Sequence, residues 1–334
     1  MRLLAPHNRP DGFVNRILCG DACEVLRQLP DGCVALAVTS PPYWNAVDYG
    51  VERQIGQCAY EEYLGQLLEV WRETERVLLP NGKLAIVTPI MPIPKDVMPD
   101  QHTRHLKNLS SDIEHTILAQ IPSLKRFSLF VWQKQTTVKM FGSYPYPPNI
   151  YEDNTVEFIN VFVKDGAPIG VPKAVKEASR LTQEQWLNLS MQVWPIYPED
   201  IRRAGGHPCP FPVVLPQRLI MMYTFRGAKS GTVTDSSRSK SVTVPDSAPN
   251  LAEGDFVLDM FSGTGATCVA AASMGRTYLG IDLSPDFCRL AEQRVATERV
   301  NERAIMLTRV KVRRAEADYQ RHLPGTEENS EVGS

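Results

Sequence analysis

A buried-strand pattern that runs into two consecutive prolines constrains this chain more than any other stretch. Val34 to Val38 is a short run of small and branched apolar residues, which predicts a fully buried strand. Pro41 and Pro42 remove two backbone donors and fix two φ angles, so we expect the strand to stop at Thr39 and a stiff, extended loop to follow. Open α/β sheets bind their ligands at this carboxyl end of the strands.

The loop Ser40 to Tyr43 carries groups suited to hold one flat ligand. Ser40 supplies a hydroxyl, Pro41 a carbonyl and Tyr43 an aromatic face. A planar base with an exocyclic amine would fit between them. An isolated Pro-Pro-Tyr is more often a plain loop, so the rest of the chain has to decide between the two interpretations.

A second stretch, Phe256 to Thr267, predicts an apolar strand, a glycine turn and then a helix from Ala266 to Met274. Gly263 and Gly265 allow positive φ and close approach of the backbone, and a helix N-terminus offers free N–H groups to a carboxylate. The next strand, Thr277 to Ile281, ends at Asp282. A carboxylate at the end of that second strand is placed to accept hydrogen bonds from ribose hydroxyls.

Together the two stretches resemble the DNA amino-methyltransferases, which methylate cytosine N4 or adenine N6. Ser40-Pro41-Pro42-Tyr43 after an apolar strand resembles their catalytic motif. Asp259-x-Phe261-x-Gly263-x-Gly265, followed by Gly280-Ile281-Asp282, is similar to their S-adenosylmethionine pocket. With the catalytic loop first, the order resembles the circularly permuted class found in restriction-modification systems and phages. The resemblance covers roughly residues 15–300.

The resemblance implies a set of site residues. The catalytic ones are Ser40, Pro41, Pro42 and Tyr43, and the cofactor-binding ones are Asp21, Thr39, Phe211, Asp259, Phe261, Ser262, Gly263, Gly265, Thr267 and Asp282. Asp21 follows a short strand, and its local sequence fits a helix N-cap equally well. Serine at the first loop position favours cytosine N4 as the target, with adenine N6 as the alternative. The implied cofactor is S-adenosylmethionine and the implied partners are double-stranded DNA and a cognate restriction endonuclease, with no metal.

The predicted fold class is α/β, a doubly wound, mostly parallel Rossmann-like methyltransferase sheet with a small inserted target-recognition region. Residues 1–164 form its catalytic half, 165–206 an insertion outside the sheet that carries target recognition, 207–312 the cofactor-binding half and 313–334 a flexible tail. Residues 226–250 are rich in Ser, Thr and Gly and predict a flexible surface loop. Ala304 to Val312 is expected to add a last strand.

Several elements of the catalytic half are predicted from local patterns. Glu61 to Leu79 has an apolar stripe at helical spacing and predicts a helix that Pro80-Asn81-Gly82 ends, and Lys83 to Thr88 predicts a buried strand. Pro89 to Pro99 holds four prolines and is expected to be irregular. The loop Phe141 to Pro148, rich in Pro and Tyr, is expected either to pack against a flipped base or the DNA backbone or to cap the core.

Composition narrows the class of protein. The formal net charge is −2, so nucleic-acid binding has to come from a local basic face rather than from a basic average. There is no apolar run of about 18 residues and no charged-then-apolar leader, so we expect a cytoplasmic protein without a membrane segment. The seven cysteines are scattered without a C-x-x-C pair, which supports neither a disulfide framework nor a zinc site.

Four other functions stay open at this point. Pro208-Cys209 raises the thiolate chemistry of cytosine C5 methyltransferases, but those enzymes carry the cofactor motif ahead of the cysteine and lack Ser-Pro-Pro-Tyr. A nicotinamide oxidoreductase is disfavoured because Cys268 replaces the third glycine of the dinucleotide fingerprint. An RNA or protein amine methyltransferase and a non-catalytic DNA-binding relative are the remaining alternatives.

Overall fold

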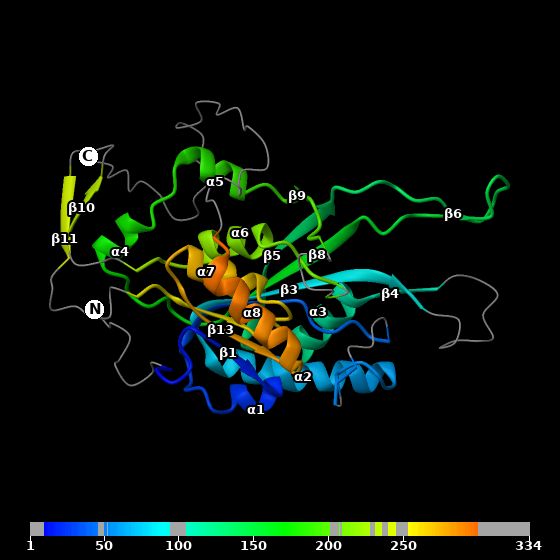
Figure 1. The fold of residues 1–334 in the computed structure, drawn as a ribbon, viewed down its shortest axis with the longest axis horizontal. Helices are drawn as coiled ribbons and strands as arrows, with labels where there is room; N and C mark the ends of the chain where they lie inside the picture. The colour runs from blue at the N-terminus through cyan, green and yellow to red at the C-terminus, as the bar shows by residue number, and fades with distance from the viewer. Residues whose placement is uncertain are drawn as a thin grey trace, which may run out of the picture.

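The computed structural model describes residues 10–45, 50–51, 53–93, 105–200, 207, 209–227, 231–235, 240–244 and 253–299. Its main sheet runs in the order β1-β13-β12-β2-β3-β8-β5-β9, and β4 pairs with β3 outside this path (Figure 1). The strands are β1 Arg16–Cys19, β2 Val34–Thr39, β3 Leu78–Pro92, β4 Leu106–Asn108, β5 Leu124–Lys134, β8 Val156–Lys164, β9 Val193–Ile196, β12 Phe256–Asp259 and β13 Thr277–Asp282.

The sheet is mainly parallel. All neighbours from β1 to β3 in this order are parallel, and so are β5 and β9, whereas β8 is antiparallel to both β3 and β5. Parallel neighbours need crossover connections, and helices between the strands supply them. The predicted α/β class with a doubly wound, mostly parallel sheet is therefore confirmed.

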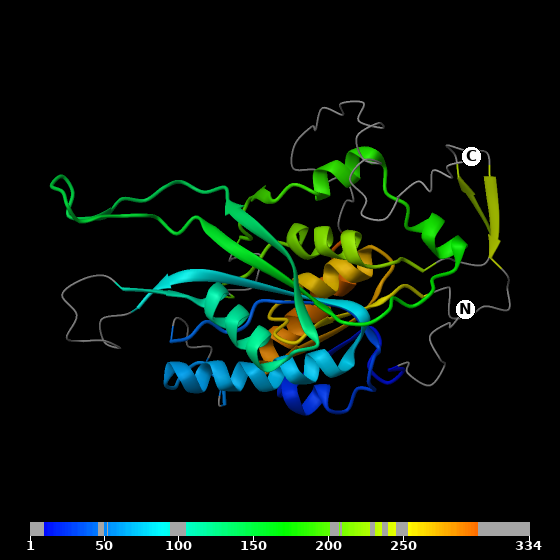
Figure 2. The same ribbon diagram turned by 180° about the vertical axis from the view of Figure 1, so that it is seen from behind.

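Helices cover both faces of the sheet, as Figures 1 and 2 show. Side chains of β3 alternate between two apolar cores: Leu84 and Ile86 lie in one, and Ala85 and Val87 lie in the other. This burial on both faces explains why the central strands are apolar throughout rather than alternating. Helices α1 Ala22–Leu26, α2 Tyr60–Val77 and α3 Leu109–Gln120 pack in the first core, and α6 Val214–Tyr223, α7 Ala266–Ser273 and α8 Pro285–Thr297 in the second.

The segment 165–206 was predicted to lie outside the sheet, which is wrong for β9 within its described residues, 165–200. After the short helices α4 (Lys173–Ala178) and α5 (Gln183–Leu189), β9 joins the sheet beside β5. Trp194 of β9 is fully buried, its ring stacks on Phe130 at 4.6 Å, and the Arg218 guanidinium lies over it at 4.5 Å. β9 has only four residues, one of them a proline, so it is too short to show the alternation of apolar and polar side chains by which a strand is recognised. The sequence therefore did not predict it.

The expectation for Pro80 to Gly82 and for the first part of the proline-rich stretch is also wrong. Helix α2 ends at Val77 and β3 begins at Leu78, so Pro80 to Gly82 form an irregularity within the strand, with Asn81 at a φ of 63°. At its other end β3 continues to Pro92 because residues 90–92 pair with β4. Pairing with neighbouring strands thus overrides the local preference of proline for loops.

The stretch 226–250 contains a hairpin instead of being a plain flexible loop. Its antiparallel strands are β10 (Gly231–Asp235) and β11 (Lys240–Val244). The predicted strand 304–312 and the predicted tail 313–334 lie outside the described residues. Among the helices of the described ranges, none is both long and apolar enough to cross a membrane.

A two-stranded arm leaves the sheet between β5 and β8 and projects far from the body of the molecule (Figures 1 and 2). It holds β6 (Phe141–Gly142) and β7 (Ile150–Tyr151), and the exposed fractions of Tyr144 and Tyr146 are 79% and 75%. These aromatic side chains therefore do not cap the core, which removes one of the two expectations for this segment.

Candidate active site

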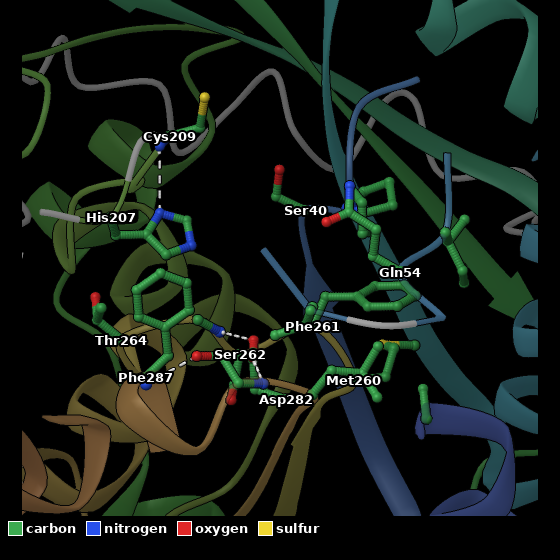
Figure 3. A pocket seen from close by; sticks show the side chains of 18 of the residues that line it. Ser40, Gln54, His207, Cys209, Met260, Phe261, Ser262, Thr264, Asp282 and Phe287 are labelled. Carbon is green, nitrogen blue, oxygen red and sulfur yellow. Dashed lines mark hydrogen bonds between the residues drawn. The ribbon is translucent and has the colours of Figure 1, made fainter. Parts of the chain in front are cut away.

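The candidate site lies where the order of the sheet reverses. From β12 the chain proceeds to its neighbour β13 on one side, and from β2 it proceeds to β3 on the other, while β12 and β2 lie side by side. Such a switch point opens a crevice at the carboxyl ends of the two central strands. A cavity occupies this place (Figure 3). Its walls come from residues in six regions of the chain: 20–22, 40–43, 51–55, 207–211, 260–266 and 282–287.

The predicted catalytic loop forms one wall of the cavity. β2 ends at Thr39 as expected, and Ser40, Pro41, Pro42 and Tyr43 all line the cavity. The hydroxyls of Ser40 and Tyr43 are 2.8 Å apart, and the buried Tyr63 donates a hydrogen bond to the Pro42 carbonyl at 3.0 Å. Among the described residues no backbone group donates to the Pro41 carbonyl. The loop therefore presents a hydroxyl, a carbonyl and an aromatic ring at one place.

The glycine turn forms the opposite part of the wall. Gly263 and Gly265 have φ of 48° and 82°, which side-chain-bearing residues rarely adopt. A Cβ on Gly263 would lie 2.8 Å from Nε2 of His207. A Cβ on Gly265 would lie 2.8 Å from the Cβ of Ala291 in α8. Both positions therefore need glycine for packing as well as for backbone conformation.

Asp282 brings a carboxylate to this side of the cavity, and Ser262 beside it keeps its hydroxyl buried against Gly280. The Asp282 carboxylate accepts from the Gly263 N–H at 2.8 Å and from the Ser284 N–H at 2.9 Å. Burial raises the pKa of Asp282, and these two N–H groups oppose that rise. The Ser262 hydroxyl is buried and has no hydrogen-bond partner among the described residues. A buried hydroxyl of this kind is costly unless a ligand or water satisfies it.

Four predicted cofactor residues, Thr39, Asp259, Gly265 and Thr267, lie behind the wall and do not line the cavity. The fully buried Asp259 accepts from the Thr39 hydroxyl at 2.8 Å, from the Thr267 hydroxyl at 2.7 Å and from the Phe261 N–H at 3.2 Å. Burial raises the pKa of Asp259 to about 6 against the effect of these three donors. The arrangement ties the end of β2 to the glycine turn and the first turn of α7.

Asp21 combines the two roles that its sequence left open. Its carboxylate caps α1 by accepting from the Glu24 N–H at 3.0 Å, and the residue also lines the cavity. Phe211, Phe261 and Ser262 line the cavity as well. The geometry therefore brings together ten of the fourteen predicted residues.

The segment 207–211 brings a histidine and a cysteine to the cavity wall. Burial favours the neutral imidazole and the neutral thiol over the charged forms. The His207 ring lies 4.7 Å from that of Phe287, and its Nδ1 accepts from the Cys209 N–H at 3.2 Å (Figure 3). Burial, together with the Arg294 charge, lowers the pKa of His207 to about 4. Burial also raises the pKa of the Cys209 thiol, which works against the thiolate that a cytosine C5 methyltransferase needs.

The sequence analysis assigned no role to several residues that the structure brings to the site. Gln54, His207 and Phe287 line the cavity, and Glu157 accepts from the Tyr43 hydroxyl at 3.3 Å. Glu157 stands between apolar residues near the start of a mostly apolar strand, which is the one feature of the sequence that marks it as unusual. Contacts between residues so far apart in the chain leave no other trace in a single sequence.

Comparisons with known proteins agree with this geometry. Residues 34–293 match a family model of N6/N4 methyltransferases that is described as DNA methylase. The Type II methyltransferase M.Cfr9I from Citrobacter freundii is 26% identical over 84% of this chain and 88% of its own length. M.XycI, a Type II methyltransferase from Xanthomonas campestris pv. cyanopsidis, is 27% identical over 88% of this chain and 92% of its own.

Two solved structures are also similar. TTHA0409, a proposed DNA modification methylase from Thermus thermophilus solved with S-adenosylmethionine, is 30% identical with a TM-score of 0.63, over 84% of this chain and 93% of that one. The cytosine-N4-specific PvuII DNA methyltransferase is 17% identical with a TM-score of 0.55, over 86% and 89% of the two chains, and this likeness concerns the fold alone.

The low pKa of His207 predicts a pH-dependent loss of stability. The unfolded chain protonates this histidine near 6.5, whereas the folded protein does so only near 4, so stability falls as the pH drops through that window. At pH 5 the expected loss is about 2 kcal/mol. Urea unfolding at pH 8 and pH 5 should show that His207→Gln removes this part of the pH dependence.

The exposed histidine of α3 provides the control, since His115→Gln should keep the wild-type difference between the two pH values. An equal difference in His207→Gln and wild type would show that the imidazole is not held neutral by burial.

Proposed function

Because the chain belongs to the family of N6/N4 DNA methylases, we propose that it transfers a methyl group from S-adenosylmethionine to the N4 amine of a cytosine flipped out of double-stranded DNA. The observation that carries the proposal is that Ser40 to Tyr43 and the turn at Gly263, which are far apart in the chain, line one cavity. TTHA0409, solved with S-adenosylmethionine, supports this cofactor as the occupant of the cavity.

The residues of the cavity fit S-adenosylmethionine. Asp282 lines the cavity and retains lone pairs that ribose hydroxyls would satisfy. The N-terminus of α7 offers N–H groups to the methionine carboxylate. Phe261 and Phe287 supply apolar walls.

The bound cofactor supplies an electrophilic methyl group on a positively charged sulfur. The protein has to present a base amine to it, and an amine inside a duplex is out of reach. Extruding the nucleotide costs roughly a few kcal/mol. Stacking of the base on the Tyr43 ring returns about 1–3 kcal/mol of this cost.

Ser40 and Pro41 then orient the amine. Its lone pair is conjugated with the base ring, which makes it a poor nucleophile. When the Ser40 hydroxyl and the Pro41 carbonyl accept its two hydrogens, the nitrogen becomes more pyramidal and its lone pair points at the methyl carbon. In the transfer a nitrogen–carbon bond would form as the carbon–sulfur bond breaks, the electron pair of the broken bond would stay on the then neutral sulfur, and the methylated nitrogen would release one proton to solvent. Most of the rate enhancement comes from orientation and electrostatics, without a covalent enzyme intermediate.

The relatives with known names suggest the biological system in which the protein acts on double-stranded DNA. M.Cfr9I and M.XycI are named Type II methyltransferases, a type that serves restriction-modification systems. We propose the same setting here, with a cognate restriction endonuclease as functional partner and the cytoplasm, where a prokaryotic genome lies, as location.

Removing the Asp282 carboxylate is expected to weaken cofactor binding. Hydrogen bonds to a charged group contribute about 1.5–3 kcal/mol, so Asp282→Ala should raise the dissociation constant of S-adenosylmethionine roughly tenfold to hundredfold. Isothermal titration calorimetry measures this constant directly.

The matched control is Asp286→Ala, which removes an exposed carboxylate four residues further on in α8 and should leave the constant unchanged. Circular dichroism establishes that both variants are folded. Wild-type affinity in a folded Asp282→Ala protein would remove this residue from the cofactor site.

Cytosine N4 is proposed over adenine N6 because of the side chain at the first loop position. The family usually has Ser there for cytosine and Asp or Asn for adenine. Ser40 is shorter than Asp and uncharged, so it suits an amine that is held close to the loop.

Mass analysis of nucleosides from methylated DNA tests this assignment. Incubation of unmodified DNA with the protein and the methyl donor should yield N4-methylcytosine. N6-methyladenine without N4-methylcytosine would overturn the base assignment while leaving the fold and the transfer chemistry in place.

Target recognition is proposed to reside in residues 165–206, which carry a local group of Lys and Arg. Because β9 belongs to the sheet, the test should exchange only residues 166–190 with the corresponding residues of a relative and keep 193–196. Sequencing of the modified DNA should then show a changed site. An unchanged site would direct attention to residues 89–107 or to the hairpin β10–β11.

A further inference from the structure

Four polar groups form one connected line that leads from the cavity into the sheet. The Ser40 and Tyr43 hydroxyl oxygens are 2.8 Å apart, and the Tyr43 hydroxyl donates to Oε2 of Glu157 at 3.3 Å. The other carboxylate oxygen, Oε1, lies 2.6 Å from the ammonium nitrogen of Lys134. Ser40, which Figure 3 labels, and Tyr43 both line the cavity, whereas Glu157 and Lys134 lie behind it.

Glu157 occupies a position where a charge is costly. It belongs to β8, which is paired on both sides, opposite Pro89 of β3 and Trp132 of β5, and only 6% of the residue is exposed. Lys134 approaches it from β5 and also lies over the Trp132 ring. A buried ion pair of this kind rarely adds net stability compared with apolar side chains. Its presence beside the catalytic loop therefore calls for a functional explanation.

The charges fix the direction of every hydrogen bond along the line. A carboxylate paired with an ammonium group only accepts, so the Tyr43 hydroxyl has to donate to Glu157. A phenol has a single proton, so the bond between Tyr43 and Ser40 has to be donated by Ser40. The Ser40 proton then points away from the cavity, and its remaining lone pair faces the ligand.

We propose that Glu157, held by Lys134, is a positioning residue that keeps Ser40 as a hydrogen-bond acceptor for the target amine. The inference rests on the proposed function and deepens it by naming the group that orients the catalytic serine. Without the carboxylate, the Tyr43 hydroxyl is free to turn and donate to Ser40. Ser40 would then present its proton to the amine, which is the wrong polarity for a group that has to accept.

Steady-state kinetics of Glu157→Gln and Tyr43→Phe test the role. Both variants keep the approximate shape of the side chain, and Tyr43→Phe keeps the stacking ring. We expect kcat to fall about tenfold or more in each, with little change in the KM for S-adenosylmethionine, because only the orientation of the amine is affected.

The double variants separate a positioning role from a structural one. If both residues act through Ser40, the combination of Glu157→Gln with Tyr43→Phe should be no slower than the slower single variant. Neither change should slow Ser40→Ala further in single-turnover assays. Multiplicative losses, or losses of melting temperature alone with unchanged kcat, would overturn the proposal.

A second ion pair on the same strand provides the matched control. Lys164 at the other end of β8 lies 3.2 Å from Glu75, and the side chains are 19% and 21% exposed. Glu75→Gln therefore removes a comparable partly buried carboxylate far from the cavity and should leave kcat unchanged. An equal loss in Glu75→Gln would assign the effect to sheet stability.

Neutron diffraction of the deuterated protein tests the bond directions without any assay of activity. The deuterium of Tyr43 should point at Glu157, and that of Ser40 should point at Tyr43. A Ser40 deuterium directed into the cavity would overturn the inference even in an active enzyme. A wild-type protein that methylates no DNA would instead overturn the proposed function, while the neutron result would still decide the orientation.

Discussion

The site depends on one buried carboxylate at the junction of its two halves. Asp259 ends β12 and accepts hydrogen bonds from the Thr39 hydroxyl, at the end of β2, and from the Thr267 hydroxyl, in α7. The loop that we propose to be catalytic starts one residue after Thr39, and the glycine turn lies between Asp259 and Thr267. A single charged group thereby sets the distance between the two motifs, at the cost of a carboxylate buried away from solvent. Its role is to place the cavity wall rather than to form part of it.

Helices and strands with a clear apolar pattern in their own residues could be predicted from the sequence. Strands that form only because they pair with a distant strand could not. β2 and the glycine turn each have an apolar pattern and an end signal within a few residues, and the structure has them where expected, while the apolar stripe of α2 located the helix but not its end. β9 has four residues and a proline, and it is a strand only because β5 lies beside it. Likewise, the proline-rich end of β3 stays extended because β4 pairs with it.

The same division holds within the site. Ser40 and Asp282 follow strands whose carboxyl ends had to meet at one edge of a parallel sheet, so their proximity could be predicted. The contact of Tyr43 with Glu157 joins residues 114 positions apart and arises from an antiparallel strand whose place in the sheet the sequence did not reveal. The histidine and the cysteine of the cavity were visible as residues, but their neutral forms follow from burial, which only the folded structure shows.

The adjacency of β2 and β12 also has a consequence for protein synthesis. Thr39 and Asp259 are separated by 220 positions, so at 5–20 residues per second the ribosome needs roughly 10 to 40 s between them. During that time β2, which is buried on both faces in the final sheet, has no partner on the side that β12 later occupies. The nascent chain therefore carries an open apolar strand edge until its last quarter emerges, and this interval is when it depends most on chaperones or on slow, dilute expression to avoid aggregation.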